Sequence, residues 1–211
     1  MQSQELSHLH VITSHGEHVL SNQDHDKSFL EPNNHIEADT HLFLHLADAV
    51  RSGHSKAFMR TVDSDIVVLA TALFKRLVHL GLTHLWIGFG KGKNYRDIPI
   101  HEICSRMSDE ETRALLLFHA LSGCDTVSQP MGIGKKTAWD RWKSMPKLTQ
   151  TFISLLENPE KYSKDTPEFQ VLQRYMILQY AKTSSANNLN EARLQLFSCG
   201  KKTLETLPPK R

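Results

Sequence analysis

The amino-acid sequence predicts an α/β fold, with a partial parallel sheet flanked by helices and a helical C-terminal appendage. Two observations predict the sheet. Residues 56–62 and 83–89 are apolar and strand-like, and a run with helical character joins them. A third observation predicts the appendage, because the pattern from residue 146 onward is helical. Strand–helix alternation is typical of a parallel sheet, so the first half of the chain should contain the core.

The first 35 residues are predicted to be weakly structured. Two short strands, 11–13 and 18–20, are expected there across the turn at 14–17, and the polar run 21–34 indicates a loop. Many of the thirteen histidines of the chain fall in its first 54 positions. Their spacing matches no zinc template, so a polar, loop-rich segment is the favoured interpretation of them.

A helix is expected over residues 36–51, since apolar residues recur there on one face. Its first turn carries Glu37 and Asp39, where acidic side chains interact favourably with the helix dipole. After the strand at 56–62, either Asp63 or Ser64 can cap the next helix, which should run to about residue 79.

The run 83–89 is aromatic and alternating, which predicts a second strand, and residues 95–100 are expected to pair back as an edge. A short helix should follow at 101–106. Ser108 and Glu111 form a capping box that opens another helix. Later, Thr166-Pro167 is a typical helix start, with proline at the first helical position.

The composition limits the classes of protein to which the chain can belong. The chain has 211 residues, 39% of them hydrophobic, and a formal net charge of +2, which is too small to indicate nucleic-acid binding by itself. Three widely spaced cysteines argue against a disulfide framework and a thiolate zinc site. The first residues lack an apolar signal core, and the run 66–74 is too short to cross a bilayer. We therefore expect a soluble intracellular protein, nuclear or cytoplasmic, with no membrane partner.

Acidic residues at three places suggest a metal site. Glu37 and Asp39 open a helix, Asp63 and Asp65 follow a strand, and Asp125 follows Gly123 in a turn. Chemistry in open α/β sheets usually lies at the carboxyl ends of strands, and Mg²⁺ prefers carboxylate oxygens. Each acid taken singly is better explained as a helix-terminal, capping or turn residue. The hypothesis is that all five form one cluster.

A glycine–lysine turn suggests contact with a nucleic-acid backbone. Gly132 and Gly134 precede a helix start, where free N–H groups bind anions, and Lys135 and Lys136 add positive charge. The turn is not a Walker loop, because Gln129 stands where the first glycine would be needed. A simple helix start is the alternative explanation.

Taken together, these motifs resemble the flap-endonuclease and 5′ nuclease branch of PIN-like nucleases. The matching motifs occur in the family's order: Glu37-Ala38-Asp39, Asp63-Ser64-Asp65, Gly123-Cys124-Asp125 and Gly132-Ile133-Gly134-Lys135-Lys136-Thr137-Ala138. The chain also resembles a widespread set of animal PIN-like proteins associated with mobile elements. The resemblance covers residues 35–142. It implies a PIN-like core at 36–145 that ends in a helix–turn–helix, between the N-terminal segment 1–35 and a helical extension 146–211.

The resemblance also implies roles for these residues. The divalent-metal ligands, for Mg²⁺ or Mn²⁺, would be Glu37, Asp39, Asp63, Asp65 and Asp125, with Asp63, Asp65 and Asp125 as catalytic residues. The backbone of a nucleic acid, DNA in preference to RNA, would be held by Gly132, Gly134, Lys135 and Lys136. In this family a monovalent cation often accompanies the helix–turn–helix. The implied activity is Mg²⁺-dependent hydrolysis of phosphodiesters, as an endonuclease or exonuclease.

One departure from the family leaves alternatives open. The family carries further metal-ligand aspartates on earlier strands, whereas residues 1–35 offer no acid in a comparable position. This predicts an N-terminally truncated or degraded copy. A non-catalytic nucleic-acid-binding or assembly module that retains the fold is therefore the second hypothesis. A structural domain whose acids only cap helices is the third.

Overall fold

The computed structural model describes residues 9–32, 38–124, 130–161, 163–200 and 207–208. Contacts within the chain divide it into two compact units. The first comprises Met1–Ala70 with Phe74–Glu102, and the second comprises Thr71–Leu73 with Ile103–Arg211. The predicted domain boundaries near residues 35 and 145 fall inside these units. The predicted mixture of helices and strands is confirmed.

The first unit begins with a β-hairpin. Strands β1 (Ile12–His15) and β2 (His18–Ser21) pair antiparallel, and Gly16 supplies the positive φ that the tight turn requires. Both expected short strands are confirmed. Val19 is buried, and its backbone N–H donates to Glu31 Oε1 at 2.7 Å. Defined contacts therefore hold the hairpin to the loop that follows it.

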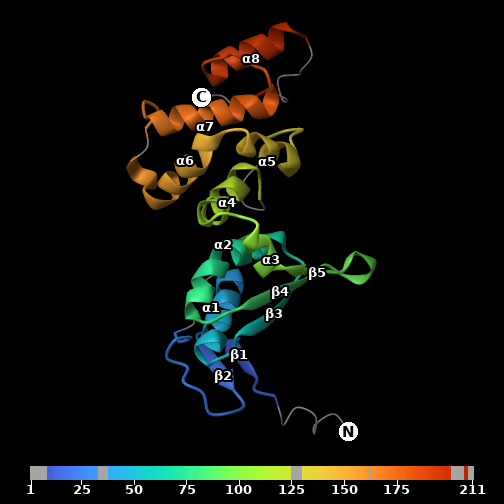
Figure 1. Cartoon of the computed structure of the whole chain (residues 1–211), viewed down its shortest axis with the longest axis vertical. Coiled ribbons are helices and arrows are strands. Elements are labelled where there is room, and N and C mark those ends of the chain that lie inside the picture. The colour runs from blue at the N-terminus through green and yellow to red at the C-terminus, as the bar shows by residue number, and fades with distance from the viewer. Residues whose placement is uncertain (1–8, 33–37, 125–129, 162, 201–206, 209–211) are drawn as a thin grey trace. The chain divides into compact units, whose positions relative to one another are not determined.

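The first unit also contains a three-stranded sheet in the order β3-β4-β5 (Figure 1). Strands β3 (Lys56–Thr61) and β4 (His84–Phe89) are parallel, as predicted, and β5 (Arg96–Pro99) is antiparallel to β4. The expectation that residues 95–100 pair back as an edge strand is confirmed, and the sheet is therefore mixed, with one parallel and one antiparallel pair. Only a short connection with a 3₁₀ turn at Gly92–Asn94 separates β4 from β5, and a connection of that length joins antiparallel neighbours.

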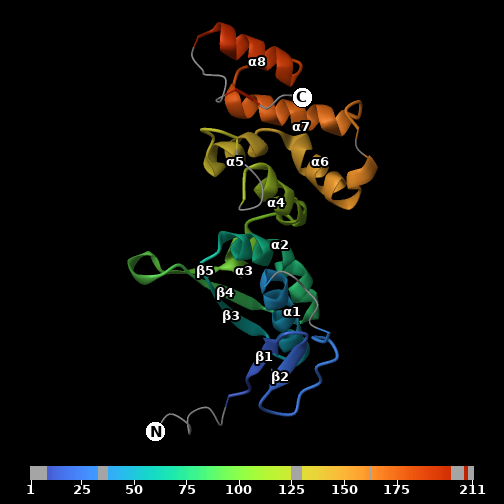
Figure 2. The ribbon, with the colours of Figure 1, turned by 180° about the vertical axis from the view of Figure 1, so that it is seen from behind.

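Two helices, α1 (Ala38–Arg51) and α2 (Ser64–Leu80), lie to one side of this sheet in both views (Figures 1 and 2). Residues on the strands alternate between two faces. Met59, Leu85 and Ile87 are buried, whereas the neighbours of Met59 on β3 are exposed. The sheet is therefore apolar on its packed face and polar or aromatic on the other.

The part of the second unit that the structure describes is helical, as predicted. Helix α3 (Ile100–Ser105) follows β5. The remaining helices are α4 (Asp109–Leu121), α5 (Lys135–Lys143), α6 (Pro146–Glu157), α7 (Pro167–Tyr180) and α8 (Leu189–Ser198). The capping box of Ser108 and Glu111 is confirmed, as is Thr166 at the start of α7. One apolar cluster joins α4 to α7, and it consists of Ala114, Phe118, Ala138, Trp142, Leu148, Phe152, Ile153 and Tyr175.

The turn after β4 requires glycine at position 90, and substitution can test this requirement. Gly90 has φ +89°, and a Cβ there would lie 2.6 Å from the backbone oxygen of Asn94. We expect Gly90→Ala to lower the free energy of unfolding by about 2 kcal/mol or more, because strain and a backbone clash add. Gly92→Ala is the matched control: φ is +52° and the space is open, so about 1 kcal/mol is expected. Urea unfolding of both variants measures this, and equal losses would contradict the clash.

Candidate functional site

The acidic turn Asp63–Asp65 lies where β3 ends and α2 begins. Asp63 is the N-cap of α2, with extended backbone, and its Oδ1 accepts the backbone N–H of Asp65 at 2.8 Å. The backbone N–H of Asp63 in turn donates to Thr61 Oγ1 at 3.0 Å. Both carboxylates are partly exposed. Two of the predicted metal ligands therefore stand together at the carboxyl end of a parallel strand.

Of the other three predicted metal ligands, the structure describes the position of one. Asp39 lies in the first turn of α1 and is partly exposed, while Glu37 and Asp125 fall outside the described residues. Among the residues with described positions, no three His, Cys, Asp or Glu side chains are grouped closely enough to hold a metal ion. Asp39 therefore does not complete a three-ligand group with Asp63 and Asp65. Mg²⁺ often takes only one or two carboxylates from the protein, so Asp63 and Asp65 still fit such an ion.

The glycine–lysine turn leads into α5, as predicted. Gly132 has φ +73°, and Gly134 is the N-cap of the helix with no side-chain cap bond. The Lys136 side chain is 90% exposed and lies 3.2 Å from Asp140 Oδ2. It is accessible to a phosphate backbone, although its role there stays a prediction.

Lys135 is engaged within the protein. Its Nζ donates to the backbone oxygen of Gly123, lies 3.3 Å from Ser122 Oγ and lies 3.2 Å from His119 Nδ1. A cation at the carboxyl end of a helix, here α4, satisfies carbonyl groups that have no helical partner. In this structure Lys135 therefore stabilises the end of α4. To bind a nucleic acid as predicted, Lys135 would have to break these contacts.

Sequence reasoning missed the exposed face of the sheet. Lys56, Phe58 and Arg60 alternate along β3 and are all exposed, and Phe58 exposes 56% of its surface. The register places Trp86 beside Phe58 and His84 beside Lys56 on the same face. The signal was in the strand itself, because every second residue from 56 to 60 is basic or aromatic.

Aromatic contacts order this face. The rings of His84 and Trp86 stack with centroids 5.4 Å apart, and the guanidinium of Arg60 lies 4.8 Å from the Tyr95 ring centroid. Gly88 leaves room for the ring of Phe58 and the hydroxyl of Tyr95, each of which a Cβ would approach to 2.6 Å. We call this surface the basic–aromatic face, and it consists of Lys56, Phe58, Arg60, His84, Trp86 and Tyr95.

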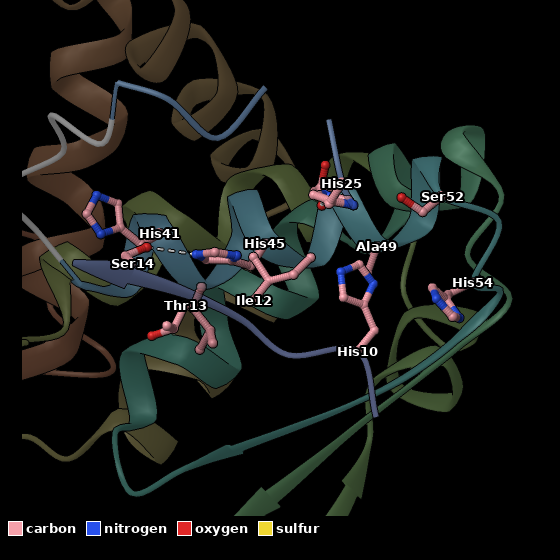
Figure 3. A pocket seen from close by; sticks show the side chains of 12 residues that line it. His10, Ile12, Thr13, Ser14, His25, His41, His45, Ala49, Ser52 and His54 are labelled. Carbon is pink, nitrogen blue, oxygen red and sulfur yellow. Dashed lines mark hydrogen bonds and ion pairs between the residues drawn. The ribbon is translucent and has the colours of Figure 1, made fainter. Parts of the chain in front are cut away.

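A cavity of about 600 Å³ lies beside the hairpin (Figure 3). We call it the histidine pocket. Its lining includes the imidazoles of His10, His25, His41, His45 and His54, together with the Asp48 carboxylate. In Figure 3 the histidines come from the segment before β1, from the loop after β2, from α1 and from the turn after α1. Segments separated in the sequence thus converge on one space.

Hydrogen bonds fix the orientation of several of these side chains. His45 Nε2 lies 2.9 Å from Ser14 Oγ, and His25 Nε2 lies 2.8 Å from Oδ2 of Asp48, which is only 6% exposed. Burial lowers the pKa of His45, and nearby His41 adds to this while Asp48 opposes it. His10 and His25 contact edge to face, with centroids 5.1 Å apart.

The sequence interpretation of the histidines missed this pocket. They were explained by a polar loop-rich segment, but His41, His45 and Asp48 belong to α1. Their spacing of four and then three residues places them along one face of a helix, which is the signal that could have revealed them. The partner histidines lie on loops, whose approach to α1 is set by tertiary contacts.

The fold and these sites define a mixed α/β protein with a small sheet, an acidic strand end and a histidine-lined cavity. Among the helices that the structure describes, none has the length and hydrophobicity of a membrane span. Comparison with protein-family models, with curated proteins and with solved structures found no match for this chain.

Proposed function

We propose that this chain is a divalent-metal-dependent nuclease-like domain of the flap-endonuclease, PIN-like type, which acts on the phosphodiesters of nucleic acids. One observation carries the proposal. Strand β3 exposes Lys56, Phe58 and Arg60 along one face and is followed directly by Asp63 and Asp65 at the start of α2. Groups that would attract a nucleic-acid strand and groups that would bind Mg²⁺ therefore follow one another from β3 into the start of α2.

The basic, aromatic and acidic side chains each have the chemistry that their proposed role requires. Lys56 and Arg60 neutralise phosphates, and the rings of Phe58 and Trp86 offer surfaces on which bases stack. Asp63 and Asp65 would hold the metal, with Asp125 as the further ligand that the resemblance implies. When bound, the metal supplies a more acidic water and neutralises charge on the reacting phosphate.

A second function has its own support. A non-catalytic nucleic-acid-binding or assembly module would need the basic–aromatic face but no complete metal site. What favours it over the nuclease is that no three-ligand group is found among the residues of described position. This alternative predicts salt-sensitive binding without turnover.

A cleavage assay separates the two functions. Purified protein is incubated with labelled 5′-flap DNA, single-stranded DNA and single-stranded RNA in Mg²⁺, in Mn²⁺ and in EDTA. Cleavage with either metal and none in EDTA supports the nuclease. Binding that weakens with salt, without cleavage, supports the non-catalytic module. Absence of both binding and cleavage overturns both.

Substitutions on β3 test the binding surface directly. We expect Phe58→Ala to weaken binding of single-stranded DNA about tenfold, since stacking of one base contributes about 1–3 kcal/mol. Arg60→Gln should lower the salt dependence of binding by about one phosphate contact. Val78→Ala and Arg76→Gln are matched controls, because both residues are exposed on α2. Fluorescence anisotropy at several salt concentrations measures these effects, and equal losses in the controls would contradict the assignment.

A further inference from the structure

The histidine pocket has features that the nuclease proposal does not use. We propose that it binds a small organic phosphate, a phosphate monoester of about the size of a mononucleotide. The volume of about 600 Å³ lies within the range of small-molecule sites. The inference does not rest on the proposed nuclease reaction, because the acidic turn contributes no residue to the lining.

The lining combines an apolar wall with convergent polar groups. Ile12, Leu42 and Ala49 supply apolar surface, while Thr13 and Ser14 bring hydroxyl groups. Such a combination is typical of a site in which an apolar wall takes the body of a ligand and a few polar groups orient it. Imidazole N–H groups and hydroxyls can both donate to phosphate oxygens.

Once its histidines are protonated, the charges around the cavity favour an anion. Among the described lining residues Asp48 is the acidic one, and its Oδ2 lies 2.8 Å from His25 Nε2, so a protonated His25 would balance its negative charge. Within the described part of the lining no lysine or arginine occurs, so the histidines there are the source of positive charge. A transition metal is a poorer occupant, since no three possible ligands are suitably grouped among the described residues.

Because the histidines supply the positive charge, the affinity of the pocket for a phosphate should depend on pH. The titratable groups that face the cavity come from every segment around it, and they are His10, His25, His41, His45, His54 and Asp48. Histidine side chains ordinarily gain a proton near pH 6.5, so the cavity becomes more positive as pH falls. His45 resists this change because burial lowers its pKa, and as a neutral ring it can still exchange a hydrogen bond with Ser14 or with the ligand.

Two of the histidines, His45 and His54, have different proposed roles in binding the phosphate. His45 is held by Ser14 within the cavity, which suits it to orient a phosphate oxygen. His54 is exposed in the turn after α1, so its charged form keeps its hydration and can attract the anion from solution. Replacing either one should weaken binding, and His54→Gln carries little risk to the fold.

Titration calorimetry with defined probes tests the proposal on the full chain. The probes are adenosine 5′-monophosphate, ribose 5-phosphate and unphosphorylated adenosine, at pH 6.5 and at pH 8.0. The second pKa of a phosphate monoester is about 6, so the ligand keeps most of its charge over this range. We expect both phosphates to bind at pH 6.5 and to bind at least about tenfold more weakly at pH 8.0, a difference of about 1.4 kcal/mol.

Variants and controls decide the outcome. His45→Gln and His54→Gln should each weaken phosphate binding severalfold. His79→Gln, at an exposed position in the last turn of α2, should leave it unchanged. Circular dichroism checks the fold of each variant. Equal binding of adenosine, no saturable binding at pH 6.5, or an equal effect of His79→Gln would overturn the proposal, whatever the result of the cleavage assay.

Discussion

Replacing Trp142 with alanine is expected to lower the free energy of unfolding of the second unit by about 3–5 kcal/mol. Trp142 is 1% exposed, and its ring lies 5.0 Å, centroid to centroid, from those of both Phe118 and Trp139. Its indole N–H also donates to Thr149 Oγ1 at 2.9 Å. Truncation removes these contacts, leaves a cavity and takes away the hydrogen bond, and each of these effects destabilises the helical packing.

The loss is large because small units are only marginally stable, at about 5–15 kcal/mol. Urea unfolding followed by circular dichroism measures it. Phe197→Ala is the control, since Phe197 is 55% exposed on α8, and a change of about 0.5 kcal/mol or less is expected. Trp142→Phe should fall between the two, because it keeps an aromatic ring but loses the bond to Thr149. A loss from Trp142→Ala no larger than that from Phe197→Ala would contradict the assigned core.

Elements with strong local signals were predicted well. The capping box at Ser108, the Thr166-Pro167 helix start and the alternation around β3 and β4 depend on residues close together in the sequence. Local hydrogen bonds and side-chain periodicity decide such elements, so a single sequence contains the information. The pair Asp63 and Asp65 belongs to this group, because a cap and the turn after a strand are both local.

Features that depend on tertiary contacts were missed. The basic–aromatic face required the knowledge that β3 and β4 leave one face uncovered by α1 and α2. The histidine pocket required a loop and a hairpin to fold back on α1. Lys135 shows the same limit: its sequence context predicts a phosphate contact, but the end of α4 lies within reach of its ammonium. A lysine ammonium binds the carbonyl groups that lie nearest to it in the folded protein. The spacing of residues in the sequence does not show which carbonyl groups these are.

The structure shows where Asp63 and Asp65 lie, at the turn between β3 and α2. Their role as metal ligands stays a prediction. The convergence of Glu37 and Asp125 on the same place stays a prediction, because both lie outside the described residues. A functional measurement on Asp63 and Asp65 is therefore the most direct way to examine the proposed metal site.

The double substitution Asp63→Asn with Asp65→Asn is expected to lower Mg²⁺-dependent cleavage of flap DNA by at least about 100-fold. Even residues that only support a metal ligand contribute about 10–100-fold to affinity or activity, so loss of two ligand charges should exceed that range. Asparagine keeps a side-chain oxygen and is a good N-cap, which preserves the bond from the backbone N–H of Asp65 to position 63. The variant should therefore unfold at nearly the same urea concentration as the unmodified chain.

Cleavage should fall in this variant without a loss of DNA binding. Removing two negative charges near a phosphate backbone should leave affinity for DNA equal or higher, because Lys56 and Arg60 remain. Asp24→Asn, at an exposed loop position, is the control and should not affect cleavage. If the double variant cleaves like the unmodified chain, Asp63 and Asp65 serve only as the cap and first turn of α2. If it binds DNA normally and cleavage is lost, the acidic turn is the place where the metal acts.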